Sequence, residues 1–183
     1  MKTLFTVLLA LSTFGAIAQN NDFKNDAVNN LTPEIKGGTQ TSTDALQASL
    51  YELTDQYLAV HQMHWNVRGP EFYSLHDLLG ELYEDLAGSI DMIAERKLAL
   101  GQAADGRPDA VAKNANLEAI PADYVKDSQV IDLLSKRYKT ITDRLGDRIE
   151  ETGKTDVATQ DALIGVRRMI DLHLYKLRSF TYK

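Results

Sequence analysis

The sequence predicts an all-α protein built as a four-helix bundle, and three observations lead to this fold class. Apolar residues recur at alternating spacings of three and four in four separate stretches, which is the period of one face of an α-helix. No stretch alternates with the period of two that a half-buried strand shows. The connection between the first two stretches is short and the one between the second and third is long, as in a bundle with one long crossover.

The first two predicted helices lie on either side of a break at Gly69-Pro70. The first follows Ser42-Thr43-Asp44, a cluster of residue types that cap helix N-termini. Its apolar stripe consists of Leu46, Leu50, Leu53, Tyr57, Val60 and His64. The second stripe consists of Leu75, Leu79, Leu82, Leu86, Ile90 and Ile93. Gly101 is expected to end the second helix, because glycine readily adopts the left-handed conformation that follows many helices.

The long connection, residues 101–126, contains two prolines and is expected to hold one short helix near residues 109–115. The third helix is expected to begin near Asp127 or Ser128 and to end at Gly153. Its stripe consists of Ile131, Leu134, Tyr138, Ile141, Leu145 and Ile149. The fourth stripe consists of Leu163, Val166, Ile170, His173, Leu177 and Phe180. We interpret the histidine in this fourth stripe as a packed core residue.

Composition limits the function classes. The chain has 183 residues, enough for one domain with a hydrophobic core. It has no cysteine, which excludes disulfides, zinc–thiolate sites, iron–sulfur clusters and cysteine nucleophiles. No glycine-rich phosphate loop is present. The formal net charge is -6, so binding of nucleic acid through a basic patch is not expected.

The N-terminal 43 residues are expected to lie outside the folded domain, residues 44–183. Residues 1–18 have the layout of a secretory signal peptide, with Lys2, an apolar run and a small-x-small site at Ala16-Ile17-Ala18. We expect cleavage there and a mature protein that is exported, periplasmic or secreted, with no membrane segment; the alternative is a retained anchor. Residues 19–43, rich in Asn, Thr and Gly, are expected to form a flexible arm.

Three of the four histidines flank the Gly-Pro break. His64 lies six residues before Pro70 and His76 six residues after it, so two antiparallel helices would bring the two imidazoles level. Neutral imidazole is a good ligand for iron, zinc and copper. The sequence therefore predicts that these two histidines bind a metal, while His61, on the edge of the same stripe, is a weaker candidate.

A carboxylate pair further along the second helix is the other candidate ligand set. Asp91 and Glu95 are four residues apart and therefore share one helix face. His76 precedes Asp91 by 15 residues, which is roughly 22 Å along a helix, far more than metal–ligand bonds of about 2 Å can bridge. Either the four residues form no common site, or a second copy of the chain completes it at a two-fold interface with antiparallel second helices.

Two glycines lie on the same helix face as these candidates. Gly80 and Gly88 each cost about 0.5–1 kcal/mol relative to alanine inside a helix, which indicates that another backbone comes close. If two such helices cross antiparallel, the crossing falls near Glu84, between the glycines. Two imidazoles with one or two carboxylates and open positions suit non-haem Fe(II).

The segments HWNVRGPEFYSLH (residues 64–76) and DMIAER (residues 91–96) resemble the Dps family of mini-ferritins (DNA-binding protein from starved cells). The likeness extends over about residues 44–180. It implies a ferritin-like four-helix bundle with a short helix in the long connection between the second and third helices. It also implies a hollow dodecamer built from two-fold dimers, with a ferroxidase site at each dimer interface.

The resemblance also implies residue roles. His64 and His76 would bind iron from one subunit, Asp91 and Glu95 from its partner, and Trp65 would lie close to the site. The family often has an acidic ligand four residues after the second histidine, whereas this chain has Gly80, which puts a second iron position in doubt. Weaker expectations concern mineral nucleation and an iron pore. The nucleation residues would be Asp77, Glu81 and Asp85, which would equally suit a solvated surface row. The pore residues would be Asp156 and Asp161, which are equally suited to be helix N-terminal acids.

The implied function is oxidation of Fe(II), preferably by hydrogen peroxide, with storage of ferric mineral and protection against oxidative damage. Zinc would be a competing ion. One alternative is the same shell without catalysis, acting as a zinc or copper buffer or as a surface-interaction assembly, which Gly80 favours. A second alternative is direct DNA binding, which the acidic charge, the few lysines of residues 19–43 and the predicted signal peptide oppose.

Overall fold

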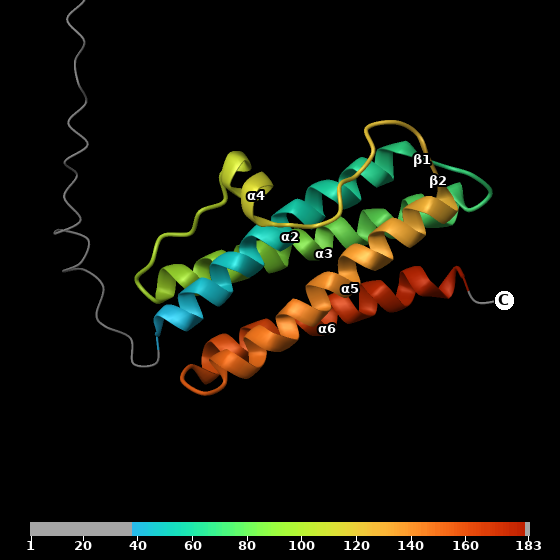
Figure 1. Ribbon diagram of the computed structural model, residues 1–183. Helices are drawn as coiled ribbons and strands as arrows, with labels where there is room; N and C mark the ends of the chain where they lie inside the picture. Colours follow the sequence, from blue (N-terminus) through green and yellow to red (C-terminus); the bar gives the residue numbers. More distant parts are fainter. Residues whose placement is uncertain (1–37, 182–183) are drawn as a thin grey trace, which may run out of the picture. The chain divides into compact units, whose positions relative to one another are not determined.

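Four long helices and one short helix make up the computed structural model over residues 38–181, the part of the chain that the structure describes. The long helices are α2 (Gln40–Asn66), α3 (Phe72–Ala99), α5 (Asp127–Thr152) and α6 (Val157–Ser179). Helix α2 packs mainly against α3, and α5 against α6, and all four share one hydrophobic core (Figure 1). Helix α4 (Pro108–Asn114) lies in the long connection. The predicted bundle is confirmed, including the short helix between the second and third long helices.

The start of the first long helix differs from the sequence-based expectation. Helix α2 begins at Gln40, and its N-cap is Thr39, whose side-chain oxygen accepts a hydrogen bond from the backbone N–H of Ser42 at 3.1 Å. The expected cap cluster, Ser42-Thr43-Asp44, therefore lies within the helix, after its first two residues. An extended Thr39 satisfies an N–H group that has no partner within the helix. The predicted signal peptide and residues 19–37 of the predicted arm lie outside the described residues.

The core follows the predicted stripes, with five members that are less buried than expected. Most members of the four stripes are fully buried. The exceptions, which are only half-buried, are Tyr57, His64, Ile90, Ile149 and Phe180. In the second half of α2 the buried positions move to Gln56, Ala59 and Met63. His64, the last member of the first stripe, is half-buried at the edge of the bundle.

A short strand pairing joins the bend to the long connection, where no strand was expected. Strand β1 (Val67–Arg68) pairs in parallel with β2 (Val125–Lys126). Two residues are too few to show an alternating pattern, so the pairing leaves no signal in the sequence. The pairing places the start of α5 beside the α2–α3 bend.

The carboxylate of Asp127 holds this bend. Its Oδ2 accepts a hydrogen bond from the backbone N–H of Glu71 at 2.9 Å, and its Oδ1 accepts one from the N–H of Ser128 at 2.7 Å. Gly69 has a φ of +142°, and a Cβ on it would clash with the same Oδ2. Glycine is therefore required there for its backbone conformation and for the space that it leaves. Gly101, at φ +79°, follows the end of α3 as predicted.

A buried charge cluster anchors the long connection. Glu52 is 3% exposed and accepts hydrogen bonds from Arg148 at 2.6 and 2.7 Å and from Arg144 at 2.9 Å. Arg144 also donates to the backbone carbonyls of Ala115 and Asn116. Helix α5 thereby holds both α2 and the segment after α4. The apolar periodicity gave no indication of this cluster.

None of the helices between residues 38 and 181 is long and apolar enough to cross a bilayer.

We predict that Gly69→Ala destabilises the protein. The added Cβ displaces the Asp127 carboxylate, and the backbone conformation is strained for any residue with a side chain, at a cost of about 1–3 kcal/mol. Thermal unfolding followed by circular dichroism measures the effect. Gly106→Ala is the matched control, because a Cβ at Gly106 meets nothing within 4 Å. Equal melting temperatures for the two variants would contradict the role of the bend.

Candidate metal centre

His64 and His76 face each other across the bend, joined by two reciprocal hydrogen bonds. The Nδ1 atom of His64 lies 2.8 Å from the backbone carbonyl oxygen of His76, and the Nδ1 atom of His76 lies 2.8 Å from the carbonyl oxygen of His64. The two rings are stacked, with centroids 3.7 Å apart and planes inclined by 19°. The prediction that antiparallel helices bring these imidazoles level is borne out by the geometry.

These hydrogen bonds determine where each ring carries its proton. A carbonyl oxygen only accepts hydrogen bonds, so both Nδ1 atoms must be N–H donors. The Nε2 lone pair of each neutral ring is then free for a metal, the arrangement found around many metal-binding histidines. Burial lowers the pKa of His64 below 6.5, although its hydrogen bond to His76 opposes that shift. His64 is therefore neutral and able to bind a metal at neutral pH.

The two imidazoles lie on one side of an open hollow of about 330 Å³. Its wall includes Gly80 and Tyr83 of α3, and three carboxylates complete the lining, those of Asp77, Glu81 and Glu84. The edge of the Tyr83 ring faces His64, with centroids 5.4 Å apart. The hollow is the space that a bound cation would occupy.

The second predicted ligand pair lies elsewhere on α3. Asp91 and Glu95 are exposed, and Asp91 follows His76 by 15 residues on one continuous helix, so the roughly 22 Å separation expected from the helical rise holds. Within residues 38–181, no group of three or more His, Asp or Glu residues is arranged to hold a metal ion. One subunit thus brings the two histidines together but not the two carboxylates.

Within residues 38–181, no backbone of the same subunit comes close to Gly80 or Gly88 of α3. A Cβ at Gly80 would lie 3.8 Å from the Cε1 atom of His64, and a Cβ at Gly88 meets nothing within 4 Å. The close backbone expected from the sequence is therefore not supplied by the described part of this subunit.

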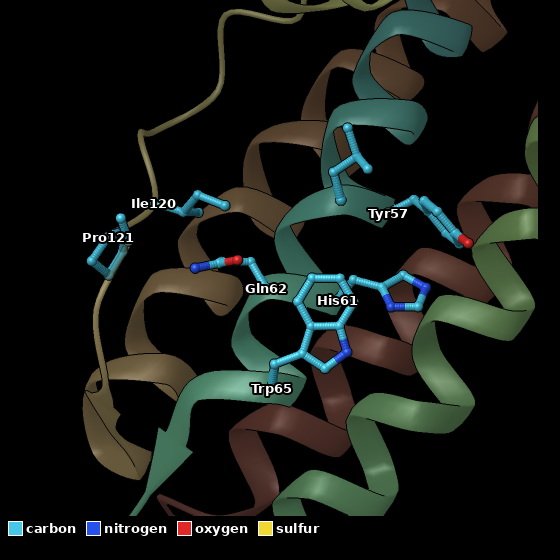
Figure 2. Close-up of a pocket in the computed structure, with 8 residues that line it drawn as sticks. Tyr57, His61, Gln62, Trp65, Ile120 and Pro121 are labelled. Atoms are coloured by element: carbon cyan, nitrogen blue, oxygen red, sulfur yellow. The ribbon is translucent and has the colours of Figure 1, made fainter.

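An aromatic cluster separates the hollow from an apolar trough on the outer side of α2. The His61 ring stacks on Tyr83 with centroids 3.8 Å apart, and Trp65 lies 5.3 Å from His61. Figure 2 shows Trp65 and His61 side by side on α2, with Ile120 and Pro121 of the long connection on the opposite side of the trough. Trp65 is 60% exposed. Because the His61 ring contacts both Tyr83 and Trp65, it packs within this aromatic cluster.

The predicted nucleation row is partly engaged by α6. Lys176 donates to Glu81 at 2.9 Å, and the Nε2 atom of His173 lies 3.0 Å from Asp85. His173 is fully buried, as predicted, and its Nδ1 atom lies 3.3 Å from the hydroxyl oxygen of Tyr138. The sequence pattern showed the acidic row but not its partners, because the partners come from a helix about 90 residues away.

The two predicted pore residues have different environments. Asp156 is 4% exposed and caps α6, accepting hydrogen bonds from the backbone N–H and the hydroxyl of Thr159. Arg96 pairs with Asp156 at 2.9 Å. This matches the alternative role of Asp156 as a helix N-terminal acid. Asp161 is exposed, and its role in a pore stays a prediction.

Comparison with known proteins gives a consistent result over the folded part of the chain. The family model described as a ferritin-like domain matches residues 43–183. The DNA protection during starvation protein 2 of Deinococcus radiodurans is 35% identical over 76% of this chain and 58% of its own length. The DNA protection during starvation protein of Agrobacterium fabrum is 31% identical over 85% of this chain and 93% of its own length. The chain thus spans little more than half of the first relative and nearly all of the second.

Solved structures with a similar fold include one that was soaked with zinc and one described as a high iron form. The Deinococcus radiodurans Dps92 structure has a TM-score of 0.76 at 35% identity, covering 77% of this chain and 86% of that chain. A zinc-soaked Listeria innocua Dps has a TM-score of 0.72 at 29% identity, covering 76% and 95%. The high iron form of Microbacterium arborescens Dps, at 24% identity, has a TM-score of 0.77, covering 83% and 99%, and supports the fold alone.

We predict that the protein is less stable in mild acid than at neutral pH, because protonation of the buried His173 opposes folding. Burial lowers its pKa below 6.5, against the opposing hydrogen bond to Asp85. A histidine with a depressed folded pKa takes up a proton more readily in the unfolded chain, so its contribution to stability is complete above pH 6.5 and falls as the pH drops towards the folded pKa. The melting temperature should therefore decrease below pH 6.5, and less steeply in His173→Gln. An unchanged slope in that variant would contradict the assignment.

Proposed function

The chain belongs to the Dps family of ferritin-like proteins, and on that premise we propose that it is a ferroxidase. It binds Fe(II) between two subunits, oxidises it with hydrogen peroxide and stores the ferric product inside a hollow shell. The observation that carries this proposal is the His64–His76 pair. Both Nδ1 atoms are engaged by backbone carbonyls, and both Nε2 atoms remain free for a metal.

A second subunit completes the site. Two α3 helices that cross antiparallel near Glu84 bring Asp91 and Glu95 of the partner subunit to the hollow beside His64 and His76. Both carboxylates are exposed, and the open surface at Gly88 leaves space for another helix to approach. Because the contact is isologous, each dimer contains two equivalent sites.

The chemistry at this site oxidises iron two ions at a time. Two Fe(II) ions each give one electron to a peroxide molecule, two protons are taken up, and two Fe(III) ions and two water molecules result. No hydroxyl radical is released when both electrons are delivered together. The imidazoles and carboxylates hold the iron, Glu95 is the bridging ligand where two irons are present, and Trp65 is the oxidisable side chain next to the site.

The wider assembly is also part of the proposal. Twelve subunits form the shell, and ferric mineral grows against the row of Asp77, Glu81 and Asp85. Iron reaches the interior through a pore near Asp161. Residues 1–18 direct the protein out of the cytoplasm and are removed. Zinc competes with iron for the two imidazoles, in line with the zinc soak of the Listeria innocua relative.

The relatives from Deinococcus radiodurans and Agrobacterium fabrum are named for DNA protection. For this chain we propose protection through removal of Fe(II) and peroxide. A formal charge of -6 opposes direct binding to DNA phosphates. A second candidate function, zinc or copper buffering without turnover, is favoured by Gly80, which supplies no ligand side chain four residues after His76.

We predict that His64→Ala and Asp91→Ala each abolish rapid peroxide-dependent Fe(II) oxidation, measured by ferric absorbance in stopped flow. The decisive experiment mixes the two variants in equal amounts, unfolds them and refolds them together. Half of the dimers are then mixed, and each mixed dimer has one fully intact site. Activity should return to about a quarter of the wild-type value, because the site is shared between subunits.

Asp143→Ala is the control for this experiment, since Asp143 is an exposed carboxylate on α5 that pairs with Lys139 of the same helix. It should leave the rate unchanged. No recovery in refolded, fully assembled mixtures would show that the two residues do not share a site across an interface. Full activity of either single variant would refute its role as a ligand.

A further inference from the structure

We propose that Lys176 of α6 controls how fast iron leaves the hollow beside His64 and His76, by holding the Glu81 carboxylate that receives it. The inference rests on the proposed function, because it concerns the regulation of the same site. Lys176 does not bind iron itself, since an ammonium group carries only hydrogen-bond donors. It acts through Glu81 and is therefore a positioning residue for the transfer of iron from the hollow to the mineral.

Glu81 belongs to both of the carboxylate groups that the transfer would use. It lines the hollow, together with Asp77 and Glu84. It is also the middle member of the row proposed for mineral growth, between Asp77 and Asp85, because residues four apart lie on one face of a helix. Asp85 follows Glu81 by about 6 Å along the axis of α3. An ion that leaves the hollow along this row therefore meets Glu81 before Asp85.

The Glu81 carboxylate is held by a cation from another helix. The Nζ atom of Lys176 donates a hydrogen bond to the Oε2 atom of Glu81 at 2.9 Å. This ion pair occupies one carboxylate oxygen and cancels the charge that attracts an incoming cation. Both side chains reach solvent, with exposed fractions of 33% for Lys176 and 61% for Glu81, and exposed ion pairs are weak. A divalent or trivalent cation can therefore displace the ammonium group, so the pair delays the ion without blocking it.

The next acid of the row is held in a different way. Asp85 accepts a hydrogen bond from the Nε2 atom of His173 at 3.0 Å. Burial lowers the pKa of His173 below 6.5, so this imidazole is neutral at pH 7 and leaves the negative charge of Asp85 uncancelled. Helix α6 thus neutralises the acid next to the hollow and not the acid one turn further on. This difference places the slow step of the transfer at Glu81.

The experiment measures how quickly the hollow becomes free again after one round of oxidation. Assembled, iron-free protein receives hydrogen peroxide and the amount of Fe(II) that saturates the first burst of ferric absorbance. A second, equal addition follows after a variable delay in stopped flow. The second burst, divided by the first burst of the same variant, gives the fraction of sites that have released their iron. This ratio corrects for any effect of a substitution on the oxidation step.

Lys176→Gln should shorten the recovery time roughly two- to fivefold, the factor that corresponds to an exposed ion pair of ordinary strength. Lys176→Arg keeps the positive charge and should recover like the wild-type protein. Glu81→Gln should lengthen the recovery time. In the double variant the acceleration by Lys176→Gln should vanish, because Lys176 acts through Glu81.

Lys139→Gln is the matched control, since Lys139 is an exposed lysine on α5 that pairs with Asp143 of the same helix. It removes the same charge away from the hollow and should leave the recovery time unchanged. Size-exclusion chromatography verifies that each variant is assembled. If Lys176→Gln does not assemble, added sodium chloride replaces it. Salt screens exposed charges, so it should shorten the recovery time of the wild-type protein and have no such effect in Glu81→Gln.

An unchanged recovery time in assembled Lys176→Gln would overturn the inference. So would an equal acceleration in Lys139→Gln, an acceleration that persists when Glu81 is also replaced, or a salt effect of the same size with and without the Glu81 carboxylate. All of these outcomes leave the first burst, and with it the proposed function, intact. The absence of a first burst in the wild-type protein would instead contradict the proposed ferroxidase site itself.

Discussion

The proposed metal centre depends on one constraint, the pair of reciprocal hydrogen bonds between the imidazole and backbone groups of His64 and His76. Each ring donates its Nδ1 proton to the backbone of the opposite helix, so the end of α2 and the start of α3 are held in register. The same bonds select the tautomer that exposes both Nε2 atoms. The register in turn requires the tight bend at Gly69, which the Asp127 carboxylate and the β1–β2 pairing hold in place. The same two hydrogen bonds therefore hold the two helices together and leave the Nε2 atom of each ring free for a metal.

The helix geometry explains why the proposed metal site cannot be completed within a single subunit. A straight α-helix separates His76 from Asp91 by roughly 22 Å, and no side chain spans that distance. Asp91 and Glu95 are among the exposed carboxylates of α3, and they contrast with the acids that are buried inside the subunit. Glu52 and Asp156 are both nearly inaccessible and bound to arginines. The two buried acids bind arginines of their own subunit, whereas Asp91 and Glu95 are accessible to a second subunit in the proposed dimer.

Polar groups inside the bundle specify how the elements pair. His173 links α6 to Asp85 on α3 and to Tyr138 on α5, and Arg144 links α5 to Glu52 on α2 and to the long connection. Breaking one partner of such a buried pair is costly because it leaves an uncompensated polar group. These contacts therefore restrict which helices can be neighbours, a restriction that apolar stripes alone do not supply.

The sequence by itself determined the fold class, the extents of the long helices to within a few residues, and the histidines that flank the bend. It did so because helical periodicity, Gly-Pro breaks and glycine stops are local signals, and the six-residue offsets of His64 and His76 from Pro70 depend only on local geometry. Only the tertiary structure decided which nitrogen of each imidazole is free, where His64 leaves the core, and which acids are already paired. Arg96 with Asp156, His173 with Asp85 and Asp127 with Glu71 join residues 56 to 88 positions apart. Nothing in the local pattern encodes such pairs, because they exist only once the helices pack against one another.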